Sequence, residues 1–402
     1  MAISRLDQAG SEPTPELQAV EVSIVMPCLN EATTLPACIA KARAAIAEHG
    51  LDAEIVVADN GSTDNSRGIA RAMGARVVVA TERGYGAAIR CGIEAARGRY
   101  IIVGDADDSY DFSAILPFVE RLRQGSDLVV GNRFKGGIDP AAMPWTHRYI
   151  GNPVLSGIGR ILFRVRIGDF HCGMRALRKD AYERMGLVGT GMEFASEMVI
   201  KAAAKGMRIE EVPTRLHRDG RNRPPHLRSF RDGWRHLRFM LLFSPRWLFV
   251  APGAALFLLG VLGSGWLITG PKEIGRFGLD IHTLLAAGFL CLLGYQTLIF
   301  GVFTKFFAIH QGFNTPNAFL TGVGKRITLE VGLLIGLALV IAGVAVLGFA
   351  VIGWSATGFG ALDPRVTMRE VIPAFVLLAL GVQTVFASFF ISILSISARR
   401  PA

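Results

Sequence analysis

The sequence predicts an α/β domain with a mostly parallel sheet, followed by a basic amphipathic helix and a four-helix transmembrane domain. Three observations lead to this fold class. Short apolar runs alternate with helical segments over residues 21–212, which is typical of βαβ units. Arginines are concentrated in residues 213–246, and long apolar segments dominate residues 247–402. The 51% share of hydrophobic residues is therefore an average over two unlike parts of the chain.

Residues 1–20 are expected to form a flexible N-terminus. They contain Asp, Glu and Pro and no apolar core of a secretory signal, so the α/β domain is expected on the cytoplasmic side. The five cysteines form no CxxC pair and no metal-ligand spacing, which favours reduced thiols. They are Cys28, Cys38, Cys91, Cys172 and Cys291.

Within the α/β domain, five strands and the helices between them follow from hydrophobic runs and glycine punctuation. The strands are expected at 21–26, 54–58, 76–80, 100–103 and 127–130. The helices are expected at 35–48, 66–73, 84–96 and 191–205, and Thr33 or Thr34 can cap the first of them. In a sheet of this kind, ligands bind beyond the carboxyl ends of the strands.

The fourth strand runs into an acidic stretch that contains Asp105 and Asp107. Residues at i and i+2 share a face in extended chain, and two carboxylates suit Mg²⁺ or Mn²⁺ bound together with a diphosphate. The alternative is a solvated acidic turn. Asn30 and Glu31 follow the first strand and Asp59 follows the second, at the same predicted edge. This convergence favours a ligand site. Asp108 and Asp111 have no predicted role.

Later polar segments are weaker candidates. Arg133 follows the fifth strand, Arg148 lies in a helical segment, and Asp169 and Arg175 bracket a glycine-bearing loop. The alternative for that loop is an ordinary turn with a surface arginine. Glu193 and the nearby Glu197 stand at the start of a helix, where acids often only compensate the helix dipole.

Residues 213–246 contain nine arginines and three histidines against two acids. Because this segment adjoins a membrane span, anionic lipid headgroups or phosphates are expected as partners, and nucleic acid is not. An apolar and a basic stripe run along it at spacings of three and four, which suits a helix in the membrane interface; the alternative is a packed surface helix with solvated arginines. The stripes are Leu227, Phe230, Trp234, Leu237 and Leu241, and Arg228, Arg231, Arg235 and Arg238.

Four spans are expected at 247–269, 281–304, 329–354 and 371–396, each long enough to cross about 30 Å of hydrocarbon. The positive-inside rule places both termini in the cytoplasm. The basic residues outside 213–246 that support this orientation are Lys305, Lys325, Arg326, Arg399 and Arg400. The spans lack runs of charge, so an ion pathway is not expected.

In combination, these motifs resemble those of family 2 glycosyltransferases of the GT-A fold, in the branch of dolichol-phosphate mannosyltransferases and polyprenyl-phosphate glycosyltransferases. The resemblance covers about residues 22–246, and four spans occur in only part of that branch. The motifs are Val25-Met-Pro27-Cys-Leu-Asn30-Glu31, Ala58-Asp59-Asn60-Gly-Ser-Thr-Asp64, Asp105-Ala-Asp107, Gly131-Asn-Arg133 and Asp169 to Gly173-Met-Arg175.

The resemblance implies inverting, metal-dependent transfer of a sugar from a GDP- or UDP-linked donor to a polyprenyl or dolichyl phosphate at the cytoplasmic membrane face. It implies the following roles. The donor pocket would be lined by Pro27, Asn30, Glu31, Asp59 and Asp105; the metal would be held by Asp105 and Asp107; catalysis would depend on Asp107, Arg133 and Asp169; and acceptor phosphate would be met by Arg133, Arg148 and Arg175.

Two departures from the family pattern, and the absence of one motif, limit what the resemblance implies. Asn60 stands where the family usually has a second Asp, and Ser109 stands where many members have a Gln; both leave nucleotide choice and metal coordination open. Ser244-Pro-Arg246-Trp247 lacks the Gln of the Gln-x-x-Arg-Trp motif of processive synthases, which argues against polymer synthesis. A glycosyltransferase for another membrane lipid, and a lipid translocase or scaffold with a degenerate nucleotide-binding domain, remain alternatives. The sugar, the prenol length and assembly into a homo-oligomer are left open.

Overall fold

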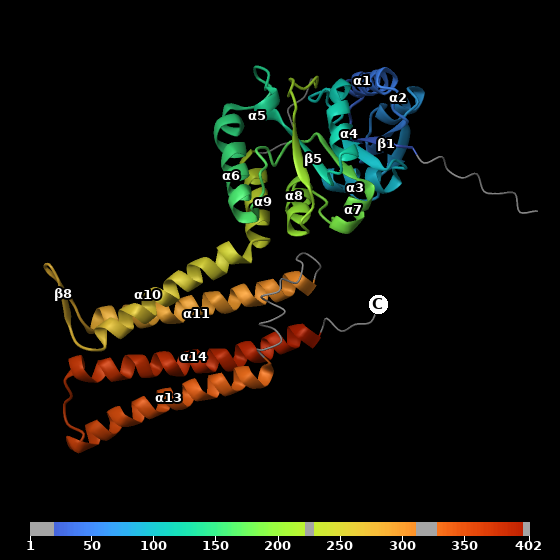
Figure 1. Cartoon of the computed structure of the whole chain (residues 1–402). Coiled ribbons are helices and arrows are strands. Elements are labelled where there is room, and N and C mark those ends of the chain that lie inside the picture. Colours follow the sequence, from blue (N-terminus) through green and yellow to red (C-terminus); the bar gives the residue numbers. More distant parts are fainter. Residues whose placement is uncertain (1–19, 222–228, 311–327, 397–402) are drawn as a thin grey trace, which may run out of the picture. The chain divides into compact units, whose positions relative to one another are not determined.

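The computed structural model describes residues 20–221, 229–310 and 328–396 (Figure 1). It contains two compact units, one built mainly from residues up to 232 and the other mainly from residue 233 onward. The second unit also includes residues 158–165 and 203–206. Apart from Val20, the predicted flexible N-terminus lies outside the described residues.

The first unit is built on a seven-stranded sheet with the order β3-β2-β1-β4-β6-β5-β7. Only β6 runs antiparallel to its neighbours, so the predicted mostly parallel sheet is confirmed. The five predicted strands are present, and β6 and β7 are additional. The strands are β1 (Val22–Cys28), β2 (Ala53–Asp59), β3 (Arg76–Val79), β4 (Tyr100–Val103), β5 (Leu128–Asn132), β6 (Arg175–Arg178) and β7 (Ile209–Pro213).

Helices alternate with these strands, and the four predicted ones begin and end within about three residues of the expected positions. The helices are α1 (Leu35–Glu48), α2 (Ser66–Ala72), α3 (Tyr85–Ala95), α4 (Leu116–Arg123), α5 (Arg133–Gly136), α6 (Asn152–Phe163), α7 (Lys179–Met185) and α8 (Phe194–Ala204), with short helical turns η1 (Phe112–Ala114) and η2 (His147–Gly151).

The predicted side-chain cap of α1 is wrong. Thr34 is the residue before the helix, but its side chain makes no cap hydrogen bond. Its hydroxyl instead donates to the carbonyl of Ala106 at 2.8 Å. The start of α1 is thereby tied to the acidic stretch, which a local sequence pattern does not reveal.

Two glycines allow α3 to pack closely on its neighbours. A Cβ at Gly92 would lie 2.4 Å from a methyl carbon of Val25 on β1, and a Cβ at Gly86 would lie 2.6 Å from the carbonyl oxygen of Gly189. The helix therefore lies directly against β1 and against the loop that precedes α8. This packing fixes the first turn of α3, which includes Tyr85.

Among its described residues, the second unit contains four helices that are long and apolar enough to cross a membrane, as predicted. Their membrane-spanning parts are Arg246–Leu267, Ile281–Phe307, Leu329–Ala356 and Pro364–Leu394, so the fourth begins seven residues before its predicted start. The elements are α9 (Ser229–Leu242), η3 (Arg246–Val250), α10 (Ala251–Leu267), α11 (Ile281–His310), α13 (Leu329–Ala356) and α14 (Pro364–Ile396), with a hairpin of β8 (Lys272–Ile274) and β9 (Phe277–Leu279).

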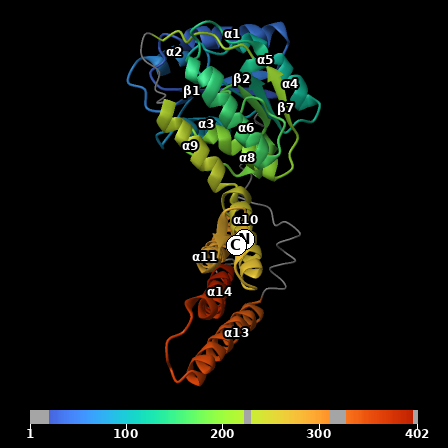
Figure 2. The same ribbon diagram turned by 90° about the vertical axis from the view of Figure 1, so that its left-hand side faces the viewer.

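Small residues bring these helices together in pairs, α10 with α11 and α13 with α14 (Figures 1 and 2). A Cβ at Gly260 would lie 2.4 Å from the backbone nitrogen of Cys291. A Cβ at Gly336 would lie 2.8 Å from the carbonyl oxygen of Gly381. Close backbone approach at small residues is how helices associate in lipid.

The helix α9 is confirmed, although Leu227 and Arg228 of its predicted stripes lie outside the described residues. His236 and Met240 are buried. Trp234 is 57% exposed, and Arg231, Arg235 and Arg238 are exposed with it. The exposed side of α9 therefore carries a tryptophan among arginines, a composition suited to a membrane interface.

Candidate active site

The carboxyl ends of β1, β2 and β4 meet at one edge of the sheet, as predicted. The backbone nitrogen of Asn60 donates to the carbonyl of Cys28 at 2.9 Å, and that of Gly104 donates to the carbonyl of Val25 at 3.2 Å. Glu31, Asp59 and Asp107 are all buried at this edge. Three separate loops therefore bring carboxylates to one place.

Asp105 and Asp107 each have one carboxylate oxygen fixed by a neighbouring hydroxyl. The Tyr85 hydroxyl donates to Oδ1 of Asp105 at 2.8 Å. The hydroxyl of Ser109 donates to Oδ1 of Asp107 at 2.5 Å, and its backbone nitrogen donates to the same oxygen at 3.0 Å. Burial raises the pKa of Asp105 to about 6, and the charge of Asp107 adds to the shift. A positive charge beside such a carboxyl group would stabilise its ionised form.

Arg221 is a site residue that the sequence reasoning missed. Its guanidinium lies 2.6 Å from Oε1 of Glu31 and 3.2 Å from Oδ2 of Asp107. Burial disfavours its charge, but the hydrogen bond to Glu31 and the charge of Asp107 outweigh this effect and raise the pKa of Arg221. Its position in a long basic segment gave no signal that distinguished it from the other arginines.

Predicted donor-binding residues at β1 and β2 organise the loops around them. Asn30 has φ of 59° and accepts a hydrogen bond from the backbone of Thr63 at 2.7 Å. Asp59 accepts from the backbone nitrogens of Gly61 and Ser62. Pro27 lies within β1 beside Ala58 of β2. Their contacts with a nucleotide stay a prediction.

Asn60, which departs from the family pattern, joins two loops. Its amide nitrogen donates to the carbonyl of Glu82 at 2.8 Å, and its amide oxygen accepts from the backbone of Gly84 at 2.8 Å. Gly84 has φ of 137° and precedes α3. An aspartate could not donate the first of these bonds, so the amide suits the loop that leads to Tyr85.

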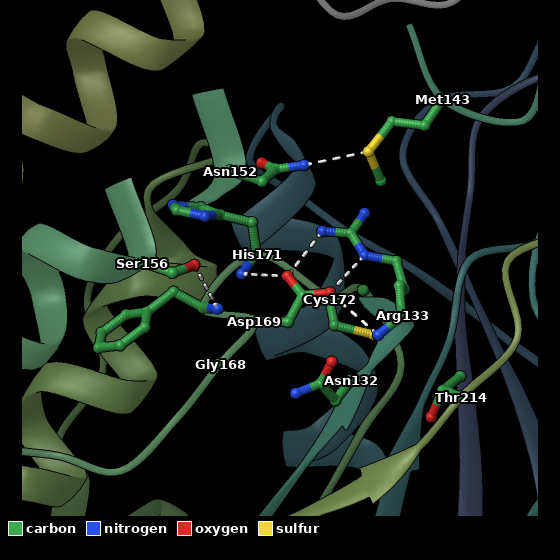
Figure 3. A network of polar contacts seen from close by, with 12 residues as sticks. Asn132, Arg133, Met143, Asn152, Ser156, Gly168, Asp169, His171, Cys172 and Thr214 are labelled. Atoms are coloured by element: carbon green, nitrogen blue, oxygen red, sulfur yellow. Dashed lines mark hydrogen bonds and ion pairs between the residues drawn. The ribbon is translucent and has the colours of Figure 1, made fainter. Parts of the chain in front are cut away.

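Arg133 and Asp169 form a buried, bidentate ion pair (Figure 3). The guanidinium Nε lies 2.6 Å from Oδ2 of Asp169, and one terminal nitrogen lies 2.8 Å from Oδ1. The backbone nitrogen of Arg133 also donates to Oδ2. Both residues were candidates from the sequence, but their pairing across 36 positions was not predicted.

The other two predicted phosphate-binding arginines have different surroundings. Arg148 stacks over the ring of Tyr149 at 5.5 Å and donates to the carbonyl of Ile138. Arg175 is 3% exposed, and burial lowers its pKa. It donates to the carbonyls of three residues, Phe170, Cys172 and Ala195. In this arrangement Arg175 holds the loop after Asp169 in place, and phosphate binding by either arginine stays a prediction.

The two unassigned acids also have partners. Asp108, with φ of 63°, forms an ion pair with Lys41 of α1 at 2.7 Å. Asp111 accepts from the backbone nitrogen of Ser113 at 2.9 Å and caps η1. Both residues therefore shape the acidic loop from outside the pair formed by Asp105 and Asp107.

The donor set at the acidic edge fits a hard divalent cation that is shared with a substrate. Among the described residues, no cluster of three or more His, Cys, Asp or Glu side chains could hold a metal ion alone. Asp105 and Asp107 provide two carboxylates. Mg²⁺ commonly binds through one or two carboxylates and takes its other ligands from phosphates and water.

Two sequence models of known families match this chain. A sequence model described as "Glycosyl transferase family 2" matches residues 23–186. A second, described as "Glycosyltransferase family 2 C-terminal transmembrane region", matches residues 302–395. The first match includes the acidic pair and both members of the buried ion pair.

Among similar proteins, the low-salt glycan biosynthesis hexosyltransferase Agl6 of Haloferax volcanii is 39% identical over 376 residues, 93% of this chain and 89% of that protein. A dolichyl-phosphate hexose transferase of the same organism is 33% identical over 40% of this chain and 68% of its own. The crystal structure of glucosyl-3-phosphoglycerate synthase from Mycobacterium tuberculosis aligns with a TM-score of 0.41 and 22% identity, over 51% of this chain and 73% of that one. The chain is therefore a membrane glycosyltransferase that belongs to glycosyltransferase family 2.

Proposed function

We propose that this enzyme transfers a sugar from a GDP- or UDP-linked donor to a polyprenyl or dolichyl phosphate at the cytoplasmic face of the membrane, with inversion at the anomeric carbon. One observation carries the proposal. A carboxylate edge suited to a metal-bound diphosphate and a buried Arg133–Asp169 pair belong to the same unit. The name of the dolichyl-phosphate hexose transferase relative supports this choice of acceptor.

On the donor side, Asp105 and Asp107 would hold a Mg²⁺ or Mn²⁺ ion, which would neutralise charge that develops on the leaving diphosphate. Tyr85 and Ser109 keep the two carboxylates in fixed orientations. Arg221 contacts Asp107 and Glu31 and would add a cation next to the diphosphate. Fixed charges of this kind stabilise a transition state because they need not reorganise.

On the acceptor side, a lipid phosphate monoester needs little activation. Its second pKa of about 6 leaves it anionic near neutral pH, so one of its oxygens can attack the sugar carbon without a strong base. Arg133 would orient the phosphate. Asp169 holds the Arg133 guanidinium by two hydrogen bonds and would position the acceptor through it. One displacement on the face opposite the leaving diphosphate inverts the anomeric centre.

Exposed apolar side chains offer a surface for the lipid. Along η2 and α6 and just before them, large apolar residues are more than half exposed, and they recur mostly at intervals of four or seven positions. They are Trp145, Tyr149, Ile150, Val154 and Ile161. An exposed apolar stripe with interfacial aromatics is suited to a lipid surface. Arg148 lies within this stripe, so a lipid phosphate would find a cation beside the apolar surface.

The proposal can be tested with membranes that contain the enzyme, polyprenyl phosphate, Mn²⁺ and a panel of labelled GDP- and UDP-sugars. We expect label to move into the organic phase with one donor, and Asp107→Asn to abolish the transfer. Asp111→Asn is the matched control, because Asp111 only caps η1, and it should retain transfer. Absence of transfer with every donor would overturn the proposal.

A further inference from the structure

One buried carboxylate next to the ion pair has no assigned role. Glu211 lies on β7, and its side chain is 8% exposed. Its Oε1 accepts hydrogen bonds from the backbone nitrogens of Gly168 at 2.5 Å and Asp169 at 3.3 Å, and from the side-chain amide of Asn132 at 3.0 Å. Its Oε2 lies 2.8 Å from Nζ of Lys135. Four donors from two segments therefore converge on one side chain.

These two segments carry the two members of the buried ion pair. Asn132 ends β5 and caps α5 through the backbone nitrogen of Lys135 at 3.0 Å, and Arg133 is the first residue of that helix. The other segment contains Asp169 itself. It is held tightly, because a Cβ at Gly168 would lie 2.7 Å from the amide nitrogen of Asn132. Glu211 thus sets the distance between the backbones that carry Arg133 and Asp169.

The neighbouring acid on the same strand has a different environment. Glu210 pairs with Arg208 at 2.6 Å and with Arg121 at 3.4 Å, and both arginines are about half exposed. Successive side chains of a strand point to opposite faces. Glu210 and Glu211 are therefore a matched pair of acids, of which only one reaches the segments of the ion pair.

We infer that Glu211 is a positioning residue for glycosyl transfer, which acts through the Arg133–Asp169 pair on the acceptor phosphate; the inference rests on the proposed function. Both carboxylate oxygens of Glu211 accept hydrogen bonds, which suits its four donors: two backbone N–H groups, a side-chain amide and an ammonium group. A glutamine would offer one oxygen and would turn an NH₂ group toward one of these donors. The two segments would then lose part of their common anchor, while the acidic edge at β1, β2 and β4 would keep all its contacts.

The test compares Glu211→Gln with Glu210→Gln in the full-length protein. For Glu211→Gln we expect kcat to fall about 10- to 100-fold, with the KM for the sugar nucleotide and the binding of the nucleoside diphosphate unchanged. Glu210→Gln should behave as wild type in all three measurements. A Glu211→Gln enzyme with wild-type kcat, or one that loses donor binding, would overturn the inference.

A double-mutant cycle separates positioning from general destabilisation. If Glu211 acts through the ion pair, Glu211→Gln should lower kcat by less than threefold in an Asp169→Asn background; a full, multiplicative loss there would contradict the inference. If Glu211→Gln does not fold, Glu211→Asp, which keeps the charge but shortens the reach, should still lower kcat, and wild-type kcat would overturn the inference. Wild-type transfer to polyprenyl phosphate in the same assay tests the proposed function separately. If another lipid is the acceptor, the same cycle applies to that lipid.

Discussion

Individual hydroxyl and carboxylate groups fix the orientation of the charged side chains in the candidate site. Tyr85 and Ser109 each fix one oxygen of an acidic residue, and Asp169 uses both oxygens to hold Arg133. Mutation of a group that hydrogen-bonds to a metal ligand typically lowers metal affinity or activity about 10- to 100-fold. Substitutions of Tyr85 and Ser109 therefore test the site without removing its charges.

Tyr85→Phe keeps the aromatic ring and removes the hydrogen bond to Asp105. We expect the Mn²⁺ concentration for half-maximal transfer to rise about tenfold, since second-sphere partners of metal ligands typically have effects of this size, and equilibrium Mn²⁺ binding to weaken in parallel. Tyr182→Phe is the control, because it removes a hydrogen bond to Glu94 of α3 instead. Equal metal requirements in wild type and Tyr85→Phe would contradict the assigned role.

Asp169→Asn keeps the shape of the side chain and removes its charge. We expect turnover to fall at least tenfold, since the bidentate hold on Arg133 is weakened, while donor binding at the other side of the site stays near wild type. Stability should also fall, because a buried arginine loses its partner charge. Initial rates measure the turnover, and equilibrium titration with the nucleoside diphosphate measures donor binding. Loss of donor binding would contradict the assignment of Asp169 to the acceptor side of the site.

At the scale of elements, the sequence alone predicted the strands whose hydrophobic pattern is local. Alternating apolar runs and glycines predicted β1 to β5 because burial on both faces leaves a continuous hydrophobic pattern. The hydrophobic pattern did not predict β6, which has an arginine at each end, or β7, which contains two glutamates. Pairing with β4 and β5 stabilises β6, and pairing with β5 stabilises β7. Neither strand has a local signature.

In the candidate site, too, local motifs could be predicted from the sequence and long-range contacts could not. The motifs predicted Asp105, Asp107, Arg133 and Asp169 as site residues, because they lie in short segments that resemble the family pattern. Long-range contacts had no such pattern. The pairing of Glu31 with Arg221 spans 190 positions, and only the folded chain brings the two together.

In the second unit, Gly260 and Gly265 of α10 make a matched test of helix packing. Gly260 faces the backbone of α11, whereas a Cβ at Gly265 meets nothing within 4 Å. Gly260→Ala should therefore lower the melting temperature in detergent by several degrees, as overpacking does, and Gly265→Ala should leave it unchanged or raise it slightly, because Ala favours a helix more than Gly does. Fluorescence-detected thermal unfolding gives both values. Equal melting temperatures for the two variants would contradict the packing of α10 on α11.

At the scale of the whole molecule, we expect the hairpin of β8 and β9 on the side of the membrane opposite the catalytic unit. Single cysteines at exposed positions test this in a Cys91→Ala background, since the other four native cysteines are buried. A membrane-impermeant maleimide should label Arg276→Cys in intact cells and Glu48→Cys only after permeabilisation. Labelling of both, or of Glu48→Cys alone, in intact cells would contradict the orientation.

The central claim is that the sugar becomes joined to a lipid phosphate. Its most direct measurement is mild acid treatment of the labelled organic-phase product made by the purified full-length enzyme. A glycosyl phosphate is labile, so we predict that the labelled sugar is released completely from the lipid. A product that keeps its label on the lipid under the same conditions would be a glycoside, and would contradict the account.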